Sequence, residues 1–148
     1  MQSDEEIFQE FFSRGGSLCM LAGVSRERLD KVYAYANQLF DKQAYKKAKS
    51  FYILLTRLDE WCFNYWLALG MCYQRLAEHE EAIFCFSRSG VIILDDPRSA
   101  FYAGISYEIL GNQIYAYKSF RAALNWCGQS VHYAEIRHLA TQALGRNQ

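Results

Sequence analysis

Histidine and cysteine are the first candidates for chemistry, because their side chains often bind metals or act as nucleophiles. His132 and His138 are six residues apart, whereas the two zinc-binding histidines of an HExxH helix are about four apart and face the same way. His79 stands between two glutamates at a predicted turn, where we expect it to face water. The cysteines include no CxxC pair, so neither a zinc site nor a disulfide framework is expected: Cys19, Cys62, Cys72, Cys85 and Cys127.

Other catalytic patterns are missing from the sequence. Gly15-Gly16 is not followed by the Lys-Ser/Thr pair of a phosphate-binding loop, and no nucleophile elbow of the form GxSxG is found. The acidic pairs Asp59-Glu60 and Asp95-Asp96 stand where helices are predicted to start, a position that favours negative charge. We therefore expect a protein that is not an enzyme and that uses no cofactor or metal.

Composition narrows the class of partner. The 16 basic and 16 acidic side chains give a formal net charge of zero, which argues against nucleic acid, since that binding depends on Lys and Arg neutralising phosphates. No apolar run approaches the roughly 18–20 residues of a membrane span. The start, Met1-Gln2-Ser3-Asp4, lacks the basic and apolar stretches of a signal peptide. We expect a cytoplasmic protein without direct membrane insertion.

A period of 34 residues organises the middle of the chain. Four classes of position recur in three registers, namely a small residue, a tyrosine or leucine, an alanine and an aromatic residue: Ala36, Gly70 and Gly104; Leu39, Tyr73 and Tyr107; Ala48, Ala82 and Ala116; Tyr52, Phe86 and Phe120. This is the period and signature of the tetratricopeptide repeat (TPR), a pair of antiparallel helices. The small residues let the two helices approach closely, and the aromatic residues fill the space between hairpins.

The repeat predicts an all-α fold of three TPR-like hairpins in a right-handed solenoid, as a single domain over 1–148. The expected helices lie near 30–42, 45–59, 63–76, 79–94, 97–110 and 113–126, within repeats that span 29–128. Segment 129–148 would supply the capping helix, near 130–144, that a solenoid needs to cover its last apolar face. Segment 1–28 would form a short amphipathic helix from Asp4 to Ser13, a breaker and a helix start at Ser25.

The concave wall of such a solenoid is built by residues of each first helix that lie between the signature positions. These residues are mostly apolar, and an apolar groove of this size favours binding of a polypeptide. The predicted wall includes Tyr33, Asn37, Phe40, Leu67, Met71, Arg98, Phe101, Ile105 and Ile109. Asn37 and Arg98 are the candidates for hydrogen bonds to a peptide backbone. The alternative for any one apolar member is packing against the C-terminal helix or the N-terminal segment.

A second TPR class clamps the acidic C-termini of heat-shock chaperones with two carboxylate-binding sites, and that class is rejected. It requires Lys where Tyr33 stands, and further Asn, Lys and Arg residues where Ala68 and Tyr102 stand. Only Asn37 and Arg98 fit the pattern.

Three stretches resemble the class II chaperones of bacterial type III secretion systems, which escort hydrophobic translocator proteins. Segment 12–21 reads FSRGGSLCML, 65–72 reads YWLALGMC, and 96–104 reads DPRSAFYAG. Each is similar to a motif of that family, and the first is not found in generic TPR proteins. The likeness covers about residues 8–127.

The resemblance implies that the chain holds an extended N-terminal segment of a translocator in its concave groove, keeping it soluble until secretion. The family's aromatic anchors match Tyr33, Phe40 and Tyr45, whereas Asn37 replaces another aromatic residue. The resemblance also implies a homodimer through the apolar residues of the N-terminal helix, Ile7, Phe8, Phe11 and Phe12, although these residues could equally dock on their own solenoid. The alternative function is a generic TPR scaffold or co-regulator of protein assembly.

Overall fold

The computed structural model describes residues 23–146 together with Ser3, Glu6, Gln9, Glu10 and Ser13. This part of the chain is helical and contains no strand. The helices are α3 (Arg26–Asp41), α4 (Tyr45–Leu58), α5 (Phe63–Arg75), α6 (His79–Ile92), α7 (Pro97–Ile109), α8 (Gln113–Cys127) and α9 (Ala134–Arg146), with a 3₁₀ turn, η1 (Val131–Tyr133), before α9. No helix within these residues is both long and apolar enough to cross a membrane.

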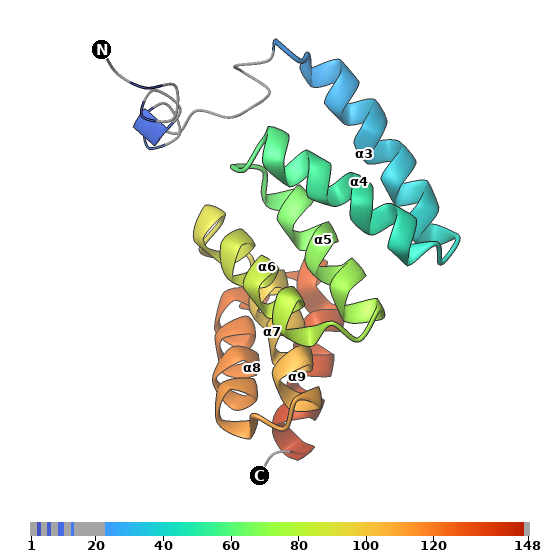
Figure 1. The fold of residues 1–148 in the computed structure, drawn as a ribbon. Coiled ribbons are helices and arrows are strands. Elements are labelled where there is room, and N and C mark those ends of the chain that lie inside the picture. Colours follow the sequence, from blue (N-terminus) through green and yellow to red (C-terminus); the bar gives the residue numbers. More distant parts are fainter. Residues whose placement is uncertain (1–2, 4–5, 7–8, 11–12, 14–22, 147–148) are drawn as a thin grey trace.

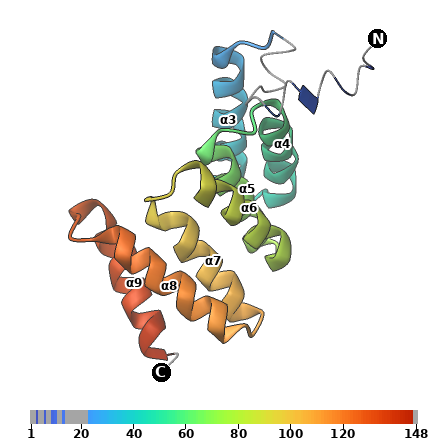
Figure 2. The same ribbon diagram turned by 90° about the vertical axis from the view of Figure 1, so that its left-hand side faces the viewer.

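Successive helices pack against each other as antiparallel hairpins, α3 with α4, α5 with α6 and α7 with α8 (Figures 1 and 2). Helix α5 also contacts α7, the first helix of the next hairpin, and the capping helix α9 contacts both α7 and α8. The predicted all-α fold of TPR-like hairpins is therefore confirmed. Helix α9 covers the third hairpin by burying Ala140, Ala143 and Leu144 against Phe120 and its neighbours.

The helix starts follow the capping signals in the sequence. Ser25 caps α3, and its hydroxyl accepts a hydrogen bond from the backbone N–H of Arg28 at 3.2 Å. This cap confirms the predicted helix start at Ser25, and α3 runs without a break from Arg26 into the helix expected near 30–42. Pro97 occupies the first turn of α7 behind the N-cap Asp96. The last helix begins at Ala134 rather than near residue 130, because Val131 lies in the 3₁₀ turn that precedes α9, where it is 89% exposed.

The signature residues form the core. Alanines at the repeat positions, Ala36, Ala48, Ala82 and Ala116, are fully buried, and Tyr52, Phe86 and Phe120 are each 1% exposed. Two glycines show how close the contact is. A Cβ added to Gly70 would lie 2.5 Å from the Phe86 ring, and one added to Gly104 would lie 2.8 Å from the Phe120 ring. The ring of the second helix thus presses directly on the backbone of the first.

Asp96 also fixes the start of α7 electrostatically. Its carboxylate accepts hydrogen bonds from the backbone N–H of Arg98 at 3.0 Å and from Nη2 of the same residue at 2.9 Å. Burial alone raises the pKa of this carboxyl, but the hydrogen bonds and charge of Arg98 outweigh burial and hold the pKa below the ordinary value of 3.8.

The glycine contacts predict that Gly70→Ala and Gly104→Ala destabilise the fold by about 1–2 kcal/mol. Overpacking a rigid, buried site typically costs about 1–3 kcal/mol, which exceeds the gain of about 1 kcal/mol from replacing Gly by Ala within a helix. Gly145→Ala is the matched control, because nothing lies within 4 Å of its added Cβ. Urea denaturation measures all three variants, and a Gly70→Ala variant as stable as Gly145→Ala would contradict the close contact.

The pKa of Asp96 predicts a pH-dependent contribution to stability. Because the folded pKa is lowered, the ionised carboxylate stabilises the fold above pH 3.8, and this contribution is lost as the pH falls through the folded pKa. Asp96→Asn keeps an oxygen for the cap but removes the charge. We expect it to be less stable than wild type by about 0.5–1 kcal/mol at pH 7, because the partner guanidinium is partly exposed. The difference should shrink at pH 3, and an equal difference at both pH values would rule out the ionic contribution.

Candidate functional site

The inner face carries a pocket of about 230 Å³ formed by α3, α5 and the start of α7. Six of the ten predicted groove residues line it: Tyr33, Asn37, Phe40, Leu67, Met71 and Arg98. Asn64 and Ala68 of α5 and Tyr52 of α4 complete the lining. Residues from three repeats, far apart in the sequence, therefore meet around one space.

Aromatic rings form one wall of this pocket. The ring of Tyr33 lies 6.1 Å from that of Tyr52 and 5.2 Å from that of Tyr65, measured between centroids. Phe40 meets Tyr45 edge to face at 5.1 Å, so Tyr45 extends the wall although it does not line the pocket itself. Both Phe40 and Tyr45 are half-buried. Such amphipathic, partly exposed rings suit a surface that grips apolar side chains.

A hydrogen bond between Tyr52 and Asn37 fixes the polar part of the wall. The Tyr52 hydroxyl donates to Oδ1 of Asn37 at 2.5 Å. Burial raises the pKa of Tyr52 well above its ordinary value, so the hydroxyl stays protonated and continues to donate. Burial also raises the pKa of Tyr33, and a hydrogen bond to the Asn37 side chain partly offsets that effect, so Asn37 lies between two tyrosines of the wall. The repeat pattern predicted only a packing role for Tyr52. The signal for its second role is the hydroxyl group, since the other two repeats have phenylalanine at this position.

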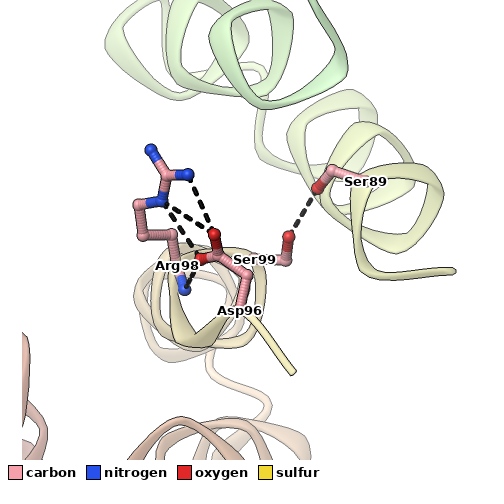
Figure 3. Close-up of polar contacts among 4 residues, drawn as sticks. All are labelled: Ser89, Asp96, Arg98 and Ser99. Atoms are coloured by element: carbon pink, nitrogen blue, oxygen red, sulfur yellow. Dashed lines mark hydrogen bonds and ion pairs between the residues drawn. The ribbon is translucent and has the colours of Figure 1, made fainter. Parts of the chain in front are cut away.

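Arg98 enters the pocket from α7 and is held in place by its neighbours. Its Nε and Nη2 donate to the two carboxylate oxygens of Asp96, and its guanidinium lies 5.0 Å above the ring of Phe63. Figure 3 shows the third guanidinium nitrogen pointing away from the carboxylate. Nearby, the hydroxyls of Ser89 and Ser99 bond to each other at 2.6 Å and tie α6 to α7 (Figure 3). The contacts with Asp96 and Phe63 therefore hold the Arg98 guanidinium in place and leave its third nitrogen as a donor.

Three predicted groove residues lie elsewhere. Phe101 is 6% exposed and packs against Phe120 with ring centroids 6.0 Å apart. Ile105 adjoins the same apolar cluster, which includes residues of α9. Ile109 is 60% exposed at the end of α7. Packing near the C-terminal helix was the alternative for individual wall residues, and the contacts of Phe101 and Ile105 fit it. Their part in binding stays a prediction.

The histidine and cysteine side chains that could do chemistry are engaged in packing or in contacts between helices. His79 is not on an exposed loop as expected, because it opens α6 and its Nδ1 lies 3.0 Å from the Ser106 hydroxyl of the next repeat. Burial raises the pKa of the Cys72 and Cys85 thiols to about 12, so both stay protonated at neutral pH. No group of three or more potential metal ligands is found among the residues that the structure describes.

The predicted dimer residues Ile7, Phe8, Phe11 and Phe12 lie outside the described residues, and so does most of the 12–21 motif. Of this segment, Ser3 and Glu6 exchange two hydrogen bonds, from the Ser3 backbone N–H to Oε2 of Glu6 at 3.1 Å and from the Glu6 backbone N–H to the Ser3 hydroxyl at 3.2 Å. This reciprocal pair has the hydrogen-bond pattern of a helix capping box.

Comparison with known proteins gives sequence and structural relatives, although no family model matches the chain. The low calcium response locus protein H of Yersinia pestis is 27% identical over 102 residues, which are 69% of this chain and 61% of that protein. The chain thus matches about three-fifths of the length of this curated relative.

The fold matches solved structures more completely. A type III secretion system complex from Aeromonas hydrophila superposes with a TM-score of 0.92 at 26% identity, covering 96% of this chain and 95% of that chain. The Yersinia enterocolitica type III secretion chaperone SycD, solved with a peptide of the translocator YopD, superposes with a TM-score of 0.82 at 22% identity over 84% of this chain and 95% of that chain. The predicted resemblance of this chain to the class II translocator chaperones of type III secretion is therefore confirmed.

Proposed function

We propose that this chain is a cytoplasmic chaperone that binds an extended N-terminal segment of a type III secretion translocator in its inner groove. The pocket lined by Tyr33, Phe40, Leu67 and Met71 is the observation that carries this proposal. Binding there keeps the translocator soluble by covering apolar side chains that would otherwise associate with each other or with membranes. A similar protein, the translocator chaperone SycD, was solved with a translocator peptide.

The size and chemistry of the pocket favour an extended segment. Its volume of about 230 Å³ lies below the roughly 300–1,000 Å³ of sites that enclose a whole small ligand, so it suits anchor side chains of a longer chain. An extended backbone brings unpaired N–H and C=O groups, which must find new partners when they leave water. Asn37, Asn64 and Arg98 stand at the pocket with amide and guanidinium groups that can pair with them.

The proposal includes the remaining predicted residues. Tyr45 continues the aromatic wall beyond Phe40, and the exposed side chain of Ile109 extends the apolar surface at the far end of α7. Pairing of two copies through Ile7, Phe8, Phe11 and Phe12 is the proposed state of the chaperone without client.

A charge placed in the pocket tests this function. Met71 is half-buried at the pocket wall, so Met71→Glu should put a carboxylate against the client's apolar anchor without entering the core. We expect binding of a translocator N-terminal peptide to weaken at least tenfold, about 1.4 kcal/mol, by calorimetry. The translocator should also become insoluble on co-expression.

Met71→Leu and Val131→Glu are the matched controls, since one conserves volume and the other adds the same charge at a site that is 89% exposed. Both should bind as wild type does, with unchanged helical circular dichroism. Unimpaired binding by Met71→Glu would show that the client does not bind in this pocket. A wild-type chain that binds only folded proteins, and no peptide, would instead favour the generic TPR scaffold.

A further inference from the structure

A separate pocket lies beside the inner groove, where α3 turns into α4 and where α5 ends (Figure 1). We call it the end pocket, to distinguish it from the inner pocket that holds Phe40 and Met71. The end pocket has a volume of about 390 Å³ and is lined by Gln43, Ala44, Tyr45, Lys46, Lys47 and Leu76. Its lining therefore combines apolar surface with two cations and includes no carboxylate.

The end pocket continues the aromatic wall of the inner groove. Tyr45 lines the end pocket, and its ring meets that of Phe40 edge to face, with centroids 5.1 Å apart. Phe40 in turn lines the inner pocket. An extended chain advances about 3.3 Å per residue, so a client side chain that packs on Phe40 lies within about three residues of the end pocket.

Arg75, the last residue of α5, stands where the two pockets meet. Its guanidinium carbon lies 5.9 Å from the centre of the Phe40 ring, and the residue after it, Leu76, lines the end pocket. Burial raises the pKa of Tyr102 on α7, and the positive charges of Arg98 and Arg75 oppose that rise. The charge of Arg75 thus acts across the inner surface, from the first repeat to the third.

The cations around the end pocket lack acidic partners. Within the part of the chain that the structure describes, Arg75, Lys46 and Lys47 form no ion pair, whereas Arg98 of the inner pocket is neutralised by Asp96. All three unpaired cations are exposed. They can therefore meet a carboxylate of a bound partner without first giving up one within the protein.

The carboxylates close to this site in the sequence do not cancel its charge. Asp41 ends α3 and is followed at once by Lys42, so these two exposed residues contribute one charge of each sign. Glu78, after the end of α5, forms an ion pair with Lys49 at 3.2 Å. The local sum of charges is thus positive, although the whole chain has a formal net charge of zero.

The repeat does not require these positive charges. One repeat later, 34 residues along the chain, Glu80 and Glu81 stand in place of Lys46 and Lys47. Arg75 suits the C-terminal end of α5, but the first turn of a helix favours negative charge, so the two lysines add nothing to the stability of α4. The positive surface is particular to this end of the groove.

We propose that the end pocket binds an acidic residue of the client's extended segment, close to the apolar anchor that packs on Phe40. This inference rests on the proposed function and deepens it, because it adds a charge requirement to the client. Backbone N–H and C=O groups are present in either direction of an extended chain, so backbone bonds alone accept both directions. An acidic residue bound at one end of the groove fixes the direction and register of the client.

Charge reversal in the chaperone tests this proposal with a translocator N-terminal peptide that the wild type binds. By calorimetry, Arg75→Glu should weaken binding about fivefold or more at about 50 mM salt, and the loss should shrink at about 500 mM because salt screens an exposed ion pair. Arg75→Lys keeps the charge and should stay within about twofold of wild type. The matched control is Arg121→Glu, exposed on α8 and outside the lining of both pockets, which should bind as wild type does.

Charge reversal in the peptide identifies the partner of Arg75. Each acidic residue of the peptide is changed to Lys in turn, and its binding to the Arg75→Glu chaperone is measured. We expect one of these changes, and only one, to restore binding to within about threefold of the wild-type pair, because only residues in contact are coupled. Restoration by none of the changes, or equal restoration by all of them, would overturn the proposal.

These measurements separate the end pocket from the proposed function. Suppose that the wild type binds the peptide, Met71→Glu does not, and Arg75→Glu binds as wild type does. The end pocket would then be overturned and the inner pocket would stand, as expected if the cations serve an acidic partner other than the client. Failure of the wild-type chain to bind any translocator peptide would overturn the proposed function, and the end pocket would fall with it.

Discussion

The contact between an aromatic ring on the second helix of a hairpin and the backbone of the first helix determines the rest of this structure. Phe86 presses on Gly70 and Phe120 on Gly104, so closely that a Cβ at either glycine would overlap the ring. Each contact uses one face of the first helix. Since the rings and small residues fill the interior of the hairpin, the opposite positions on the first helices are left to form the inner surface.

One repeat modifies that contact and thereby makes the groove polar at one end. The first repeat has Tyr52 where the others have Phe86 and Phe120, and it has Asn37 where the others have Met71 and Ile105. The two changes belong together, because the Tyr52 hydroxyl needs an acceptor once it is buried and finds it in Asn37. A polar pair thus replaces an apolar pair, and an amide reaches the inner surface without leaving an unpaired group in the core.

The sequence predicted the helices well because their signals are local or periodic. The capping signals of Ser25 and Pro97 depend only on nearby residues, and the 34-residue register is read directly from the repeated positions. The burial of Phe101 depends on how the third hairpin packs against α9, and the repeat period does not specify that packing. For this reason a residue that was predicted to line the groove lies in the core. The left-handed backbone of Ala77, equivalent to Gly111 in the next repeat, was equally hidden, since alanine carries no signal for that conformation.

The pairing of Arg98 with Asp96 shapes what the inner groove can recognise. A guanidinium already neutralised by a carboxylate attracts a second carboxylate weakly, but its remaining N–H groups still donate to a neutral carbonyl. In the proposed complex, Arg98 therefore bonds the client's backbone rather than an acidic side chain. Backbone bonds are independent of client sequence, which leaves selection to the apolar walls around Tyr33 and Met71. Such a division of roles suits a chaperone that must hold a client firmly enough to keep it soluble and still release it, because no single buried charge pair has to be broken on release.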